Sequence, residues 1–125
     1  MRKQYHFRPS PEGVLAWDVD RLVTLSADFP RISVPLAAIR ELDEPFWFSG
    51  GANEATCRAI TEHARLIEAV DLSFPIILSS DNRVMDGMHR VAKALLLGRA
   101  TIQAVRFTND PTPDFVGKGP DELPY

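Results

Sequence analysis

Carboxylate, imidazole and guanidinium side chains fall close together in one short run of the chain, Asp86-Gly87-Met88-His89-Arg90. The residues before Gly87 predict a strand and those after it predict a helix, so the helix begins with His89 and Arg90 in its first turn. A helix start presents free backbone N–H groups and the positive end of the helix dipole, and both favour an anion. Gly87, His89 and Arg90 are therefore candidate ligands of a phosphate group.

Two neighbouring residues extend this candidate phosphate site. Lys93 follows His89 by four residues, which places both side chains on one face of a helix. Asp86 is ambiguous, because a carboxylate before a glycine either contacts a metal or nucleotide or accepts hydrogen bonds from the backbone amides of a turn. The alternative for the whole run is a capped helix end that faces solvent and binds nothing.

Hydrophobic patterning predicts the elements that would position these side chains. The continuous apolar run 74–78 is typical of a strand covered on both faces, and 84–86 forms the next strand. The helix behind Gly87 ends at Gly98, and an alternating strand follows over 101–107. Together these elements predict a small mixed sheet with packed helices, an α/β fold of the α+β kind.

Upstream of this block we expect one more strand and two helices. A short strand over 31–34 leads through Pro35 into a helix over 36–42, since the first turn of a helix tolerates proline. The longest helix is expected over 53–70, with Asn53 as N-cap and an apolar stripe at three- and four-residue spacing. That stripe consists of Ile60, Ala64, Ile67 and Val70.

The two ends of the chain give weaker signals. The first dozen residues are polar and contain two prolines, which predicts a loose arm, and the four prolines after Asn109 predict an extended tail over the surface. Residues 17–25 fit either a strand or a short helix, and periodicity does not choose between them. We therefore divide the chain into an arm and first element over 1–30, a domain over 31–107 and a proline-rich tail over 108–125.

Length and composition exclude several classes of protein. With 125 residues, 45% of them hydrophobic and 25% charged, the chain fits one globular domain, and it is neither disordered nor collagen-like. The 14 basic residues are scattered against 17 acidic ones for a net charge of −3, which argues against a large nucleic-acid footprint. Cys57 is the single cysteine, so an intramolecular disulfide and a four-cysteine zinc site are excluded. No stretch is apolar and long enough for a membrane span or a signal core, and we expect a cytoplasmic protein.

Three segments share the pattern of one known family: Pro75-Ile76-Ile77-Leu78, the run from Arg83 to Arg99, and Ile102-Gln103-Ala104-Val105. Together they resemble the ParB/sulfiredoxin superfamily. The resemblance covers roughly residues 31–107 and is weaker upstream, where the run from Val34 to Ile39 is similar to the family's early strand and helix. The resemblance implies a small α/β fold in which a glycine turn and an Asp-Gly-x-His-Arg box hold the phosphates of a nucleotide. Carried over to this chain, Gly87, His89 and Arg90 would contact phosphate and Asp86 would shape the box. Met88, its middle residue, belongs with Lys93 to the same predicted set of phosphate- or nucleotide-binding residues.

The box also differs from that of particular members. Sulfiredoxins carry a reactive cysteine directly before the histidine, where this chain has Met88, so their repair chemistry is not expected. Partition proteins add DNA-binding and dimerisation domains, for which 125 residues leave no room. The most similar form is the Asp-Gly-His-His-Arg box of serine-kinase and nuclease-like members, with Met88 replacing the first histidine. In the kinase-like members an acidic residue of the early helix assists a hydroxyl nucleophile, and Glu41 is the residue we align with it, although Asp43 and Glu44 are equally available.

Three hypotheses about function follow. The leading one is a nucleotide-binding domain, an NTPase or a small-molecule phosphotransferase, with Glu41 and His89 as catalytic candidates. Its ligand would be ATP, ADP or CTP, with Mg²⁺ held largely by phosphate oxygens. The second is a non-catalytic regulatory or interaction module, in which the tail and exposed aromatic residues contact a protein partner or a second copy. The third, disfavoured by the net charge, is DNA binding or nicking.

A few other residues admit two interpretations. His63, in the middle of the longest predicted helix, either lines the pocket or is a structural histidine, and the second case is the commoner one. Cys57 is expected to be a small buried residue. The three histidines show no metal-ligand spacing. Four aromatic residues either stack on a nucleobase or, more commonly, form core: Trp17, Phe46, Trp47 and Phe48.

Overall fold

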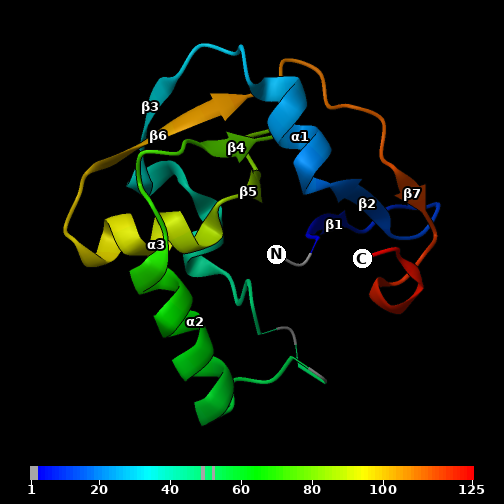
Figure 1. Cartoon of the computed structure of the whole chain (residues 1–125), viewed down its shortest axis with the longest axis horizontal. Helices are drawn as coiled ribbons and strands as arrows, with labels where there is room; N and C mark the ends of the chain where they lie inside the picture. The colour runs from blue at the N-terminus through cyan, green and yellow to red at the C-terminus, as the bar shows by residue number, and fades with distance from the viewer. Residues whose placement is uncertain (1–2, 49, 52) are drawn as a thin grey trace.

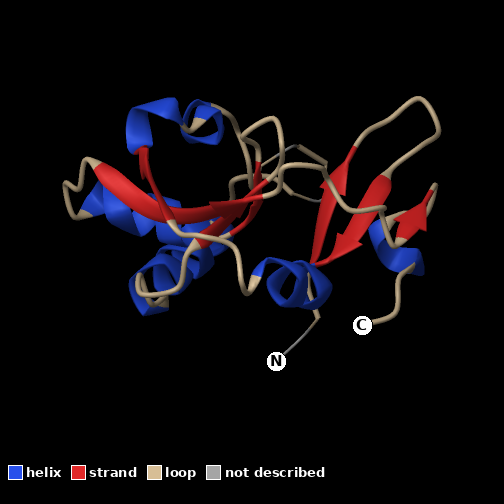
Figure 2. Ribbon diagram, turned by 90° about the horizontal axis from the view of Figure 1, so that it is seen from above, coloured by secondary structure: helices blue, strands red, loops and turns tan. Residues whose placement is uncertain are grey.

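The structure of the protein is a computed structural model that describes residues 3–48, 50–51 and 53–125. Within these residues, three α-helices and seven β-strands are arranged around two sheets (Figure 1). One sheet is mixed, with strand order β3-β6-β4-β5, and the other is antiparallel, with order β1-β2-β7. Figure 2 shows the smaller sheet at the right, beside the mixed one. The predicted α+β fold with a mixed sheet and packed helices is therefore confirmed.

The mixed sheet contains the four strands expected from hydrophobic patterning. β3 (Ile32–Pro35) is antiparallel to β6 (Thr101–Arg106), β6 is parallel to β4 (Ile76–Leu78), and β4 is antiparallel to β5 (Val84–Asp86). The chain reaches β6 from β5 through helix α3 (Met88–Leu96). This connection places the start of α3 directly behind the end of β5.

Both ends of the chain contribute to the smaller sheet, so the prediction of a loose N-terminal arm was wrong, and the tail predicted to be extended includes one short strand. β1 (Tyr5–Arg8) and β7 (Phe115–Val116) pair with opposite edges of β2 (Leu15–Asp18). These strands escaped prediction because backbone pairing with β2, rather than an apolar run, defines them. Residues 17–25, for which strand and helix were both open, divide between β2 and helix α1 (Val19–Ser26).

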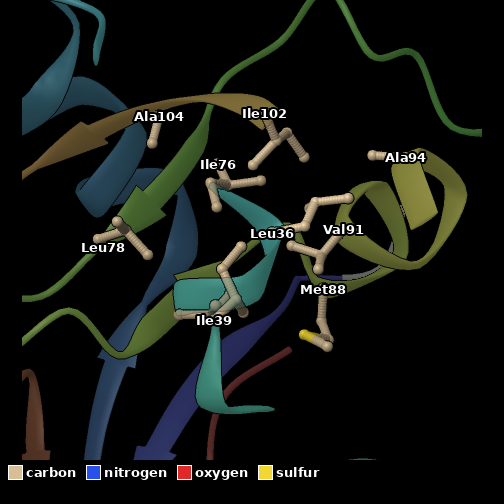
Figure 3. Packing of buried hydrophobic residues seen from close by; sticks show 10 residues of the cluster. Leu36, Ile39, Ile76, Leu78, Met88, Val91, Ala94, Ile102 and Ala104 are labelled. Atoms are coloured by element: carbon tan, nitrogen blue, oxygen red, sulfur yellow. The ribbon is translucent and has the colours of Figure 1, made fainter. Parts of the chain in front are cut away.

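Apolar side chains cover both faces of the mixed sheet. Ile76 and Leu78 of β4 pack in one cluster with Val91 of α3 (Figure 3). Ile77, between them, packs in a second cluster with Leu22 of α1. Since side chains alternate along a strand, a wholly apolar strand must be covered on both sides, as was predicted for this one. The first cluster fixes α3 against the sheet and thereby fixes the position of its first turn.

The helix predicted over 36–42 is replaced by two 3₁₀ turns, η1 (Leu36–Ala38) and η2 (Arg40–Asp43). Between them the backbone of Ile39 is extended, with φ −88° and ψ 102°. Leu36 and Ile39 are both buried in the first cluster, and a 3₁₀ turn aligns residues three apart. The turns therefore bury both side chains without a continuous α-helix.

Helix α2 (Cys57–Ala69) begins later than predicted, and its N-cap is Thr56. The Thr56 hydroxyl accepts a hydrogen bond from the Ala59 amide at 3.1 Å, whereas Asn53 forms an isolated bridge with Gly50. Threonine and asparagine are both good N-caps, so composition alone could not choose between them.

The predicted apolar stripe of α2 is only partly present, because Ile67 and Val70 are half-buried whereas Ile60 and Ala64 are exposed. All 13 residues of this helix are described and none is buried, with Ile60 51% exposed. Within the helix, the half-buried face carries Ala59, His63 and Ile67. Cys57 is exposed, contrary to the expectation of a buried thiol. Among the described residues, no helix combines the length and the apolar character that a bilayer crossing needs.

Removal of residues 109–125 is expected to lower the melting temperature by at least about 5 °C, because it deletes β7 and several contacts to β2. The Trp17 indole N–H donates to the Pro111 carbonyl at 2.7 Å, the Asp18 amide donates to Asp114 at 2.8 Å, and Leu123 is buried. Thermal denaturation followed by circular dichroism measures the effect. Asp114→Ala removes side-chain contacts and leaves β7 in place, so it should lower the melting temperature by less than the truncation does. An unchanged melting temperature for the truncation would contradict this prediction.

Candidate functional site

β5 and α3 meet at Gly87, the N-cap of α3, whose backbone is left-handed with φ 104° and ψ 23°. A β carbon at this position would lie 2.7 Å from Arg90 Nη2 and 2.8 Å from Ile76 Cγ2, so both conformation and space favour glycine. Glycine has no side chain that could cap the helix. The first hydrogen bond of the helix runs from Val91 N to the Gly87 carbonyl, and the N–H groups of the first turn come before Val91 in the chain. Such N–H groups have no partner within the helix.

Arg90 lies across this turn. Its Nη2 donates to Asp86 Oδ2 at 3.1 Å and to the Pro75 carbonyl at 3.3 Å. The side chains of Arg90 and Asp86 are 17% and 19% exposed, and Arg90 Nε is buried without a hydrogen-bond partner. A guanidinium has five N–H donors in a fixed fork, so Arg90 keeps donor capacity beyond these contacts. Asp86 orients the guanidinium against Gly87.

Three planar side chains from separate segments form a stack beside the turn: Trp47, His63 of α2 and His89 of α3. We call them the imidazole stack. The Trp47 ring centroid lies 4.5 Å from that of His63 and 4.5 Å from that of His89, with interplanar angles of 18° and 15°. His63 Nδ1 and His89 Nε2 are 2.8 Å apart, so one imidazole donates a hydrogen bond to the other. Phe48 packs edge-on against His63.

Both imidazoles of the stack are uncharged at neutral pH. Burial lowers the pKa of His89 to about 4, and the nearby His63 and Arg90 act in the same direction. Burial also lowers the pKa of His63, with Glu62 opposing the change. A neutral imidazole carries one N–H and one acceptor nitrogen. The Nδ1–Nε2 contact therefore uses the donor of one ring and the acceptor of the other.

The structure does not bring two of the predicted ligands to the turn through their side chains. The Lys93 ammonium donates to the carbonyls of Glu68 and Val70, at 2.9 Å and 2.8 Å, at the end of α2. A cation at a helix C-terminus interacts favourably with the dipole, which accounts for this contact. Met88 is 7% exposed, and its side chain packs in the first hydrophobic cluster.

Glu41 lies beside the first residue of β5, whereas Gly87 follows the last. Glu41 Oε2 accepts a hydrogen bond from the Val84 amide at 2.6 Å and lies 3.9 Å from Arg83 Nε. The Glu41 side chain is only 3% exposed. Among the described residues, no hydrogen bond or ion pair connects Glu41 with His89 or Arg90. The alternatives Asp43 and Glu44 are exposed. The contacts of Glu41 fit a carboxylate that ties η2 to the edge of the mixed sheet.

A groove of about 380 Å³ lies next to Glu41, between η2, β5 and β1. Buried polar atoms without hydrogen-bond partners occur in three of the residues that line it, namely His6 Nε2, Arg8 Nη2 and Glu41 Oε1. Burial lowers the pKa of His6 to about 4. Because all three atoms are closed to solvent, they are not accessible to a ligand in the groove.

His63 and Trp47 belong to the site, although the sequence favoured a structural role for His63 and a core position for Trp47. His63 belongs to a face that repeats every four residues through Ala59 and Ile67, one position earlier than the predicted stripe begins. Trp47 is partly buried against the first cluster and also stacks on both imidazoles, so its two interpretations are not exclusive. Trp17 is core, as the commoner interpretation had it.

Comparison of this chain with protein-family models, with curated proteins and with solved structures found no match. Within the described part of the chain, no group of three or more His, Cys, Asp and Glu residues is placed to hold a metal ion. Fold and site together define a small α+β protein in which a helix begins at a left-handed glycine, with Arg90 against that glycine and His89 of the first turn in an imidazole stack.

Proposed function

We propose that this protein binds the phosphate groups of a nucleotide at the start of α3. The observation that carries the proposal is the turn at Gly87, where the Arg90 guanidinium lies against an uncapped helix start whose first turn also contains His89. Backbone N–H groups, the helix dipole and a guanidinium all favour a phosphate. The resemblance of the Asp-Gly-Met-His-Arg box to the ParB/sulfiredoxin superfamily supports the same class of ligand.

The interactions on offer are sufficient in magnitude. Each charge-assisted hydrogen bond contributes about 1.5 to 3 kcal/mol, and an anion at a helix start gains about 0.3 to 1 kcal/mol from the dipole. Micromolar binding requires about 8 kcal/mol net. Several hydrogen bonds from the first turn and from Arg90 together reach this range.

The contacts of Arg90 indicate how a phosphate would be accommodated. Its Nη2 is already bonded to Asp86 and Pro75, and its Nε is closed to solvent. A phosphate oxygen would therefore share the guanidinium with Asp86, which keeps the fork oriented. ATP, ADP and CTP all fit this chemistry, and Mg²⁺ would be held largely by phosphate oxygens.

An NTPase or a small-molecule phosphotransferase is the reaction class that extends this proposal. Hydrogen-bond donors fixed before the reaction, here the Gly87 turn and Arg90, stabilise the charge that develops on a transferred phosphoryl group. His89 would contact the same group. A role for Glu41 as base would need a hydroxyl substrate beside β5, and its bond to the Val84 amide occupies one of its two oxygens.

Calorimetric titration with ATP, ADP and CTP, each with and without Mg²⁺, tests the proposal. We expect micromolar binding of at least one nucleotide, and a loss of about tenfold or more in affinity for both His89→Ala and Arg90→Ala, since each removes a hydrogen-bonding group from the turn. Arg99→Ala is the matched control, because it removes the same charge from the exposed residue behind the other end of α3. Absence of binding, or equally weak binding by the wild-type protein and both variants, would refute the proposal.

A second candidate, an interaction module without catalysis, is favoured by the apolar surface at the end of α3. Leu95, Leu96 and Leu97 are 54%, 75% and 56% exposed, and an apolar patch on a protein surface commonly marks a contact with another chain. The tail is a weaker element of this candidate, because its contacts with β2 are already made within the chain. The two candidates differ in the calorimetric experiment, since an interaction module requires no affinity for any nucleotide.

A further inference from the structure

His63 and His89 are joined by one hydrogen bond and covered by one aromatic ring. Their Nδ1 and Nε2 atoms are 2.8 Å apart, their ring centroids are 5.1 Å apart, and the rings are tilted by 17°. Trp47 stacks on both. The two rings come from different helices, so this contact ties the middle of α2 to the first turn of α3.

Burial opposes protonation of the pair in the free protein, and the charges around it act in both directions. On α3, Arg90 repels a proton on His89, although Asp86 of β5 partly neutralises that arginine. On α2, Glu62 favours a proton on His63, while Lys93 of α3 is bonded to carbonyls at the end of α2. The segment after η2 contributes Trp47 and Phe48, which carry no charge.

Phosphate at the start of α3 would favour protonation of the His63–His89 pair. Its negative charge would lie in the first turn, beside His89, and would offset the repulsion from Arg90. A proton on either ring would still have a hydrogen-bond partner in the other ring. The face of Trp47 also stabilises a cation.

We infer that the His63–His89 pair takes up a proton when phosphate binds at the start of α3, and that His63 is the positioning residue that makes this uptake possible. The inference rests on the proposed phosphate site. It adds His63 to the residues of that site and makes binding depend on pH. His63 acts through its hydrogen bond with His89. Nucleotide affinity then depends on pH.

The direction of this dependence follows from the proton balance. The complex binds more protons than the free protein, so affinity rises as pH falls. One extra proton corresponds to about a tenfold gain in affinity for each pH unit. The gain ends near pH 4, where the free pair becomes protonated as well, because the pKa of His89 is lowered to about 4.

The experiment is calorimetric titration with ADP, without metal, in buffers that differ in ionisation enthalpy, which measures the protons taken up on binding. Two variants of His63 separate its contributions. His63→Phe keeps a flat ring on Trp47 and removes the hydrogen bond, whereas His63→Asn keeps a hydrogen-bonding group near the position of Nδ1 and removes the ring. We expect an uptake that approaches about one proton for the wild-type protein at mildly acidic pH. It should fall close to zero in His63→Phe and persist in His63→Asn.

The outcomes distinguish this inference from the proposed function. If ADP binds the wild-type protein without proton uptake, or if His63→Phe takes up as many protons as the wild type, the inference is overturned and the phosphate site stands. Uptake that persists in His63→Phe and vanishes in His63→Asn assigns the effect to ring packing, which also overturns it. If neither ADP nor inorganic phosphate binds, the phosphate site and the inference fail together.

A measurement on the wild-type protein covers the case in which the variants do not fold. NMR titration of the histidine ring nitrogens, with and without ADP, follows each imidazole separately. We expect His63 and His89 to titrate as a coupled pair and both to shift upward with ADP. His6, which packs against Trp17 instead, is the internal reference and should not respond. Independent titration of His63 and His89, or no response to bound ADP, would overturn the inference.

Discussion

Replacement of Gly87 by alanine is expected to lower the free energy of unfolding by about 2 to 4 kcal/mol. Two effects add. The left-handed backbone at φ 104° strains any residue with a β carbon, and that carbon would lie 2.8 Å from Ile76 Cγ2 and 2.7 Å from Arg90 Nη2. Because Arg90 would have to move, nucleotide affinity should fall as well. Urea denaturation and calorimetry measure the two effects.

Gly98→Ala is the matched control for this variant. Gly98 also has a positive φ, of 74°, but a β carbon there would meet nothing within 4 Å. Its replacement should therefore cost only the backbone strain, about 1 kcal/mol, and leave nucleotide affinity unchanged. An equal loss of stability in both variants would show that close packing around Gly87 contributes nothing.

Glu41→Ala is expected to lower the free energy of unfolding by about 2 to 3 kcal/mol, because it leaves the buried Val84 amide without its partner. Glu41→Gln keeps an oxygen that accepts this hydrogen bond and removes the charge next to Arg83, so its loss should be about 1 kcal/mol. Chemical denaturation of the two variants measures the difference. Glu44→Gln, which removes the other carboxylate that pairs with Arg83, is the control at an exposed position.

The same pair of variants decides between a structural and a catalytic role for Glu41. A base must lose its function in Glu41→Gln, whereas a structural carboxylate is largely replaced by the amide. If a nucleotide-dependent activity is found, its retention in Glu41→Gln would exclude Glu41 as base. Loss of that activity in a well-folded Glu41→Gln would instead support the role that the family resemblance implies.

Where local chemistry determines the structure, the sequence was sufficient to predict it. The strand 84–86, the glycine turn and the helix behind it follow from residues within one short segment, and the structure has all three. Likewise, the apolar run of β4 implied cover on both faces, and two separate clusters provide it. In both cases the residues of one short segment are compatible with a single local structure.

Contacts between distant segments could not be predicted in this way. The pairing of β7 with β2 and the stacking of Trp47 on two imidazoles depend on how the chain returns in space. Lys93 is one turn from His89, as predicted, yet its long side chain reaches the carbonyls of α2. A flexible cation has several partners within reach, and only the packed structure shows which of them it takes.

The position of β7 determines the order in which the protein can fold. The contact between Trp17 and Pro111 spans 94 residues, whereas β4, β5 and α3 follow one another directly in the chain. Closing the longer loop costs more chain entropy, and Pro111 follows β4, β5 and α3 in the chain, so it leaves the ribosome after them. We therefore expect a folding intermediate in which β4, β5 and α3 are packed together while β2 keeps an unpaired edge until β7 joins it. Such an edge attracts strands of other chains, so this interval is the time at which aggregation threatens the protein most.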